Sequence, residues 1–84
     1  TFKNLQLAYE ALNKGGNLAC ILNAANEIAV DAFLYDKIKF LDIATINEQV
    51  MQKASFIQSP TLDDLLETDK QARELANNLI NKNL

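Results

Sequence analysis

The segment from Leu18 to Leu34 constrains the fold more than any other part of the chain. Only four of its side chains are not apolar, and these are Asn23, Asn26, Glu27 and Asp31. At about 100° per residue the four fall within an arc of about 140°, and the opposite side of the helical wheel is uniformly apolar. Because Cys20, Val30 and Leu34 lie inside the polar arc, the outward side is mixed. We therefore predict a helix that is the buried centre of a bundle, or that packs its mixed face against a second body.

Asn23, Asn26 and Glu27 place three hydrogen-bonding side chains on one patch of this helix, at the spacings of helical neighbours. Asn is a poor helix former, so two of them in mid-helix carry a local cost that tertiary hydrogen bonds would offset. Two interpretations stay open: a solvated stripe, or specific hydrogen bonds to another element or another domain. Together with Val30 and Leu34, these residues are our candidates for a domain interface.

An amphipathic helix is expected before this segment, from Asn4 to Lys14. Its apolar stripe follows helical spacing through Leu5, Ala8, Tyr9 and Leu12, and is broadened by Leu7 and Ala11. Gly15 follows directly, where a left-handed residue commonly ends a helix.

A connector and a third helix are expected after the central segment. The alternation in Lys37–Phe40 predicts a short extended connector with Ile38 and Phe40 pointing inward. Asp42 is the expected N-cap of the third helix. The inward face of that helix consists of Ile43, Ile46, Val50 and Ala54.

The last helical segment begins with Thr61 and Asp64, which form a capping-box pattern. Its inward residues are Leu62, Leu65 and Leu66. Continuing that stripe would put Asp69 on the apolar face, where an unpaired charge is costly. We therefore expect a break near Glu67, with Asp69 as N-cap of a final helix whose stripe is Ala72, Leu75, Ala76, Leu79 and Ile80. The alternative is one continuous helix with Asp69 buried against a partner.

These patterns predict one all-α domain over residues 1–84, a four-helix bundle-like fold with a short extended connector and a broken last helical segment. A chain of 84 residues makes at most one small domain. Its first residue is Thr and not Met, which suggests a segment excised from something longer.

Composition excludes several classes of function. The chain has no His, so Ser-His, Cys-His and His-zinc chemistry cannot be assembled from it. A single Cys makes no internal disulfide and favours a reducing compartment, in keeping with a cytoplasmic protein. The net charge is −3 and the basic residues do not cluster, which argues against nucleic acid or membrane as partner. No segment is apolar enough to span a bilayer.

Weak candidates for chemistry each have a simpler interpretation, so we assign no catalytic, cofactor-binding or metal residue. Cys20 lies in an apolar segment without a His to activate it, which favours a core thiol. The acidic group Asp63, Asp64, Glu67 and Asp69 lacks the spacing of a calcium loop, and capping is the favoured role. The same acidic stretch has no Ser to carry the prosthetic arm of an acyl carrier.

The sequence resembles a known family over most of its length. Leu22–Glu27, followed by Ala32–Leu34 and Phe40–Ile43, looks like the carboxy-terminal helical domain of 1-deoxy-D-xylulose 5-phosphate reductoisomerase. Leu5–Leu12 resembles the first helix of that domain. Pro60–Leu66, with Asp69 and Ala72-Arg73 after it, resembles its closing segment. The Asn-Ala-Ala-Asn-Glu stretch carries most of the specificity.

The resemblance implies an enzyme of the non-mevalonate isoprenoid pathway. Family members rearrange 1-deoxy-D-xylulose 5-phosphate on a divalent metal, Mg²⁺ or Mn²⁺, and reduce the product with NADPH to 2-C-methyl-D-erythritol 4-phosphate. In such enzymes the cofactor and metal sites lie in preceding domains and the full enzyme is a homodimer. None of the residues that form the cofactor and metal sites of such enzymes has a matching position in this sequence.

We therefore expect a structural C-terminal domain that packs against the catalytic domain of the same chain and is inactive by itself. The alternative is a free-standing acidic helical module that binds a partner protein.

Overall fold

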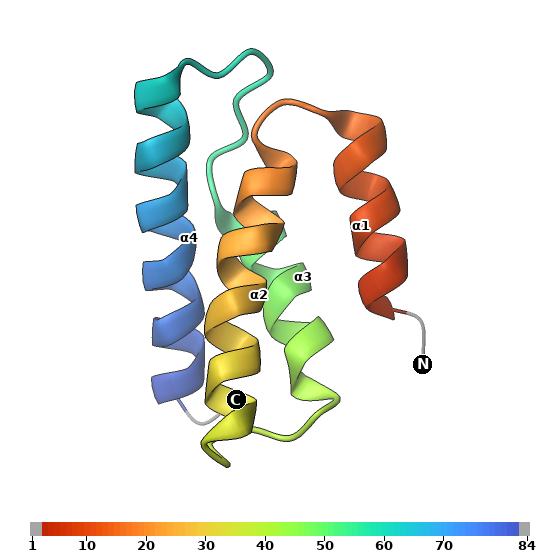
Figure 1. Cartoon of the computed structure of the whole chain (residues 1–84), viewed down its shortest axis with the longest axis vertical. Helices are drawn as coiled ribbons and strands as arrows, with labels where there is room; N and C mark the ends of the chain where they lie inside the picture. The colour runs from red at the N-terminus through yellow and green to blue at the C-terminus, as the bar shows by residue number, and fades with distance from the viewer. Residues whose placement is uncertain (1–2, 83–84) are drawn as a thin grey trace.

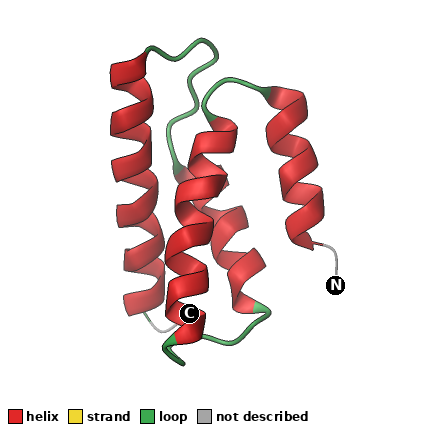
Figure 2. Ribbon diagram, in the orientation of Figure 1, coloured by secondary structure: helices red, strands yellow, loops and turns green. Residues whose placement is uncertain are grey.

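The computed structural model describes residues 3–82, and this part of the chain folds into four α-helices. They are α1 (Lys3–Lys14), α2 (Leu18–Leu34), α3 (Asp42–Lys53) and α4 (Leu62–Asn81). Successive helices run in alternating directions, so α2 and α4 point the same way, opposite to α1 and α3 (Figure 1). No strand occurs among residues 3–82, and loops alone join the helices (Figure 2). The predicted all-α, four-helix bundle-like class is confirmed. Thr1, on which the expectation of an excised segment rests, lies outside the described residues.

The helix α2 is the centre of the bundle, as its apolar circumference predicts. It packs against α1, α3 and α4, whereas α1 packs only against α2 and α3 among the described elements. The residues of α2 that are buried are Leu18, Ile21, Ala24, Ala25, Ala29 and Ala32. On α4 the buried Ala72 and Ala76 face the same core. Small side chains on both helices let their backbones approach closely.

The helix α1 is turned relative to the predicted stripe. Its buried residues are Leu7 and Ala11, which the sequence pattern placed at the margin of the stripe. Leu5, Tyr9 and Leu12 are 52%, 59% and 74% exposed. The prediction of the inward face was wrong because α1 is an edge helix that buries a narrow strip, and helical periodicity alone does not say which apolar residues form that strip.

The connector between α2 and α3 is a series of bends and turns, not the predicted extended segment. Ile38 packs against the core as expected, but Phe40 is 66% exposed and meets the ring of Phe33 edge-on, with 5.7 Å between centroids. Leu41 and not Asp42 occupies the N-cap position of α3. The Asp42 carboxylate instead accepts a hydrogen bond from the backbone N–H of Lys39 at 2.9 Å, which closes the turn before the helix. The inward residues Ile43, Ile46, Val50 and Ala54 are buried as predicted.

The helix α4 is continuous, so the predicted break near Glu67 and the N-cap role of Asp69 were wrong. Its start was predicted correctly: Thr61 and Asp64 form a capping box through both reciprocal hydrogen bonds. The buried face runs through Thr68, Ala72 and Ala76. Leu62 and Leu66, expected inward, are 72% and 63% exposed. Because the buried face runs through Thr68 and not through Leu62 and Leu66, Asp69 lies at the margin of that face in a half-buried position. The helix therefore needs no break to keep its charge out of the core.

The turn between α1 and α2 rests on two glycines in the left-handed region. Gly15 has φ +71° and its N–H donates to the carbonyl of Ala11 at 3.0 Å, which confirms the predicted C-cap. Gly16 has φ +59° and leads directly into the buried Asn17.

Candidate domain interface

The five candidate interface residues all lie on α2 and border two hollows that share Asn26. Asn23 and Asn26 line a groove between α1 and α2. Glu27, Val30 and Leu34 line a shallow depression on the α4 side, which Asn26 also borders. Asn23 is exposed and has no side-chain hydrogen bond among the described residues. Whether any of the five contacts another domain stays a prediction.

Asn26 is part of a cluster of three carboxamides that join α1, α2 and α3. The fully buried Asn47 of α3 donates from Nδ2 to Oδ1 of Asn26 at 2.9 Å and to Oδ1 of Asn4 at 3.0 Å. Asn4 and Asn26 thus direct their side-chain oxygens toward Asn47 and their NH₂ groups away from it. Asn47 Oδ1 is buried without a hydrogen-bond partner among the described residues. Of the two interpretations of Asn26, the one with specific hydrogen bonds to another element is therefore confirmed, and that element is α3 of the same domain.

Replacing Asn26 by leucine should destabilise the domain by about 1–3 kcal/mol, because the buried Nδ2 of Asn47 loses an acceptor that leucine cannot supply. Asn23→Leu on the same helix is the matched control, since that side chain is exposed and unbonded among the described residues; its change should stay within about 0.5 kcal/mol. Urea denaturation followed by circular dichroism measures both. Equal midpoints for the two variants would contradict the role assigned to the Asn26–Asn47 bond.

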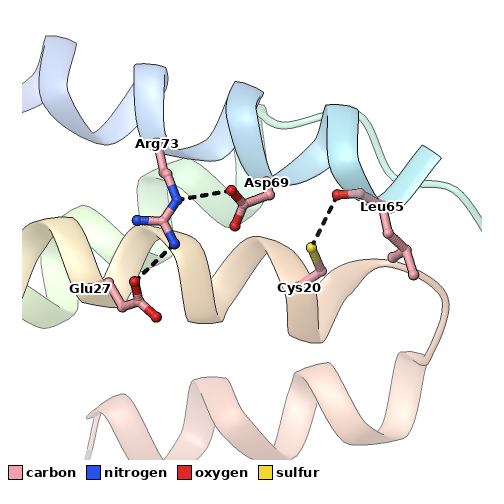
Figure 3. A network of polar contacts seen from close by, with 5 residues as sticks. All are labelled: Cys20, Glu27, Leu65, Asp69 and Arg73. Atoms are coloured by element: carbon pink, nitrogen blue, oxygen red, sulfur yellow. Dashed lines mark hydrogen bonds and ion pairs between the residues drawn. The ribbon is translucent and has the colours of Figure 1, made fainter. Parts of the chain in front are cut away.

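Glu27 belongs to an ion-pair network that ties α2 to α4 (Figure 3). Arg73 donates from one terminal nitrogen to Glu27 at 2.8 Å and from Nε to Asp69 at 2.9 Å. These hydrogen bonds, first that to Asp69 and then that to Glu27, raise the pKa of the Arg73 guanidinium. The side chain of Glu27 is 57% exposed, so each pair contributes at most about 1 kcal/mol. Asp69 is therefore neither a cap nor an unpaired buried charge.

Cys20 lies in the same region, between α2 and α4 (Figure 3). Its thiol is half-buried and lies 3.6 Å from the carbonyl oxygen of Leu65, to which it donates. Burial raises the pKa of the Cys20 thiol, and the charge of Asp69 adds to the effect. A thiol kept protonated is a poor nucleophile, which agrees with a packing role.

Two buried polar residues organise the domain and were not singled out from the sequence. Asn47 is one. Asn17, also fully buried, donates from Nδ2 to the carbonyl of Ser55 and to the hydroxyl of Thr68, both at 2.9 Å, and accepts the N–H of Ile57 at 2.8 Å. The sequence position of each residue could have indicated its role. Asn47 falls on the apolar face of its helix. Asn17 stands at the N-cap of α2, although its side chain makes no cap bond there.

Two acidic side chains lie at the start of α4. Asp64 completes the capping box, and Asp63 lies in the first turn of α4. Within residues 3–82, no three His, Cys, Asp or Glu side chains lie together in a way that could hold a metal ion. No helix in the described part of the chain is both long and apolar enough to cross a membrane.

Comparison with known proteins gives consistent matches. A family model described as DXP reductoisomerase C-terminal domain matches residues 1–75. The chain is similar to 1-deoxy-D-xylulose 5-phosphate reductoisomerase of Phocaeicola vulgatus, with 53% identity over 79 residues, which covers 94% of this chain and 21% of that protein. The same enzyme of Bacteroides fragilis is 52% identical over 81 residues (96% and 21%). That of Thermoanaerobacter pseudethanolicus is 54% identical over 74 residues (88% and 19%). The chain thus spans about a fifth of the length of these relatives.

Proposed function

The chain belongs to the family of DXP reductoisomerase C-terminal domains, and we propose that it is the structural, non-catalytic domain of such an enzyme. The observation that carries the proposal is the match of the family model to residues 1–75, together with identities near one half to full-length reductoisomerases. These matches favour a domain of a larger enzyme over a free-standing interaction module.

The proposed whole enzyme converts 1-deoxy-D-xylulose 5-phosphate to 2-C-methyl-D-erythritol 4-phosphate. A divalent cation, Mg²⁺ or Mn²⁺, would assist the rearrangement and NADPH would supply the hydride. Among residues 3–82, no group of carboxylates is placed to hold the cation. Asp64 is engaged in the capping box, and Glu27 and Asp69 are engaged with Arg73. We therefore propose that the cation is bound by the rest of the protein, and that NADPH is bound there as well.

Packing against the rest of the protein is supported by the apolar surface of the domain. Several large apolar side chains are more than half exposed; they are Leu5, Tyr9, Leu12, Leu34, Tyr35, Phe40, Leu41, Leu62 and Leu66. They lie on α1, around the α2–α3 connector and at the start of α4. Large exposed apolar patches are typical of contact sites. Asn23 and Leu34 are exposed and could take part in such a contact, while Val30 packs partly against the core and Asn26 and Glu27 form bonds inside the domain. We further propose that the complete enzyme is a cytoplasmic homodimer.

The test compares the full-length protein with the same protein truncated before residue 1 and with residues 1–84 alone. The full-length protein should oxidise NADPH when given substrate and divalent metal. The truncated protein should be less active and less stable, because an apolar surface is uncovered. Residues 1–84 should show neither NADPH oxidation nor metal-dependent binding of substrate. Either activity in that segment would overturn the proposal.

A further inference from the structure

The helix α1 is held to the rest of the domain by fewer buried side chains than any other helix. It buries only Leu7 and Ala11, and of these two only Ala11 belongs to the contiguous hydrophobic core. Among the described elements, α1 packs against α2 and α3 but not against α4, and it lies at the edge of the bundle (Figure 1). A segment with few buried apolar contacts opens at a lower free energy than the core of its protein.

Hollows flank α1 on both sides. One of about 560 Å³ lies between α1 and α3, where Glu10 and Lys14 of α1 face Met51 of α3. The other, of about 530 Å³, lies between α1 and α2, with Leu12 on one wall and Leu22 on the other. The helix therefore touches its neighbours along a narrow line and not over a closely packed face.

The polar contacts of α1 at its two ends are weak ones. At its start, Lys3 pairs with Glu48 at 2.8 Å, and both side chains are more than a third exposed, so the pair contributes little. At its end, the ammonium group of Lys14 lies 4.4 Å from the centre of the Phe56 ring. Neither contact anchors the helix in the way that a buried side chain would.

The hydrogen bond between α1 and α3 can break without leaving Asn47 unbonded. Asn47 Nδ2 donates to Oδ1 of Asn4 on α1 and also to Oδ1 of Asn26 on α2, so separation of α1 removes only one of the two bonds. Asn47 Oδ1 is buried without a partner among the described residues, which is unfavourable in the packed state. Once α1 has separated, water takes the place of Asn4 beside this carboxamide, so the packed state gains little from the bond.

The turn between α1 and α2 combines an unobstructed residue with a fixed end. A Cβ at Gly15 would meet no atom within 4 Å, so this glycine has space to change its backbone angles. Gly16, in contrast, lies directly against the carbonyl oxygen of Ile57, and the N–H of Asn17 donates to that same oxygen at 3.0 Å. The side chain of Asn17 also donates to Thr68 of α4 at 2.9 Å. Rotation about the backbone of Gly15 therefore moves α1 and leaves the start of α2 anchored.

We propose that Gly15 is a hinge about which α1 separates from a block formed by α2, α3 and α4, and that this block stays folded while α1 is apart. The three helices of the block all pack against one another, and they hold every buried helical residue of the contiguous core except Ala11. If the exposed Leu5 and Tyr9 of α1 contact the remainder of the enzyme, the block is the part that moves. The hinge lies inside the domain and does not depend on the proposed function.

The experiment labels buried cysteines with N-ethylmaleimide in the full-length protein that contains this domain. Ala11→Cys places a thiol between α1 and the block, and Ala76→Cys is the matched control inside the block, since these alanines are 3% and 0% exposed. Trypsin cleaves after Lys14 and Arg73, so mass spectrometry reports these thiols and the native Cys20 in separate peptides. Ala11→Cys should react about tenfold faster or more, because separation of α1 exposes it, whereas the control is exposed only when the block unfolds.

A third substitution distinguishes the hinge from unfolding of the whole domain. Ala72 is buried on α4, which does not pack against α1 among the described elements. Ala72→Gly lowers the helix propensity of α4, so it should accelerate labelling of Ala76→Cys about fivefold and leave that of Ala11→Cys unchanged. Equal acceleration of the two thiols would overturn the proposal. So would equal labelling rates without Ala72→Gly, or an Ala11→Cys thiol that stays unlabelled.

The native Cys20 shows whether the block is intact in each variant. It is half-buried between α2 and α4, so its labelling rate should be the same in the wild type and in Ala11→Cys. If Ala11→Cys accelerates it, Leu7→Cys replaces that probe, because it adds no volume at the α1 contact, and the same comparison with Ala76→Cys decides. Labelling requires no catalytic turnover, so failure of the hinge and failure of the proposed function are distinguishable.

Discussion

Replacing Gly16 by alanine should destabilise the domain by about 3 kcal/mol or more. Gly16 adopts φ +59°, a conformation that costs a residue with a side chain about 1–2 kcal/mol. A Cβ there would also overlap the carbonyl oxygen of Ile57 and the ring of Phe56. The clash with Ile57 is with backbone, so relieving it would move the whole loop before α4. Urea denaturation followed by circular dichroism measures the loss.

Gly15→Ala is the matched control for this prediction. Gly15 has a similar conformation, φ +71°, but a Cβ there would meet no atom within 4 Å. Its substitution should therefore cost only the conformational part, about 1–2 kcal/mol. Equal losses for the two variants would show that the close approach of Gly16 to Ile57 does not matter to stability.

Replacing Asn17 by alanine should cost about 3–4 kcal/mol. The substitution leaves three groups without their partners: the N–H of Ile57, the carbonyl of Ser55 and the hydroxyl of Thr68. The bond to Thr68 is buried and the other two are partly buried. An unsatisfied buried polar group costs about 1–3 kcal/mol. Because these partners belong to the α3–α4 loop and to α4, hydrogen exchange in both should accelerate together with the drop in the unfolding midpoint.

Two further variants sharpen the Asn17 prediction. Asn77→Ala alters an exposed asparagine of α4 and should change stability by no more than about 0.5 kcal/mol. Asn17→Asp keeps an acceptor for Ile57 N–H but loses both donated bonds and sets a carboxylate toward the Ser55 carbonyl. Its loss should be larger at neutral pH, where the carboxylate is charged, than at acid pH. A pH-independent loss equal to that of Asn17→Ala would contradict this account.

Helix positions and turn chemistry were predictable because they depend on neighbours in the chain. The capping box of Thr61 and Asp64 and the left-handed Gly15 are local patterns, and both occur in the structure as predicted. The central place of α2 was also predictable, since a helix that is apolar around most of its circumference cannot be stable at an edge.

The rotation of the outer helices was not predictable from the sequence. On α1 the pattern supports a face centred on Leu5 and Leu12 as well as one centred on Leu7 and Ala11. On α4, the predicted stripe of the C-terminal part is confirmed, since Ala72 and Ala76 are buried and Leu75, Leu79 and Ile80 pack against the core. The prediction was wrong only at the start of the helix, where Leu62 and Leu66 are exposed. In both cases the choice depends on the small side chains that α2 offers and on hydrogen bonds from residues distant in sequence.

Asp69 shows the same limit in a single residue. The pattern indicated either a cap at a helix break or a continuous helix with Asp69 buried against a partner. The helix is continuous, and Arg73, one turn further along it, donates to Asp69 from Nε at 2.9 Å. The structure adds Glu27 from α2, so that one guanidinium serves two carboxylates across two helices. The same limit applies to two of the candidate interface residues. Asn26 bonds to α3 and Glu27 to α4, and the spacing of these residues along α2 does not predict which helix supplies the partner.

The sequence by itself determined the helical class, the central position of α2, the glycine turn, the start of α4 and the lack of histidine-based chemistry. These features depend on composition and on interactions between near neighbours in the chain. Only the tertiary structure decided which face of α1 and of the first turns of α4 is buried, which partners satisfy Asn17, Asn26 and Asp69, and which apolar surface is left uncovered. The physical reason is that burial and hydrogen-bond satisfaction are properties of packed helices, and a pattern with several apolar faces fits more than one packing until its neighbours are placed.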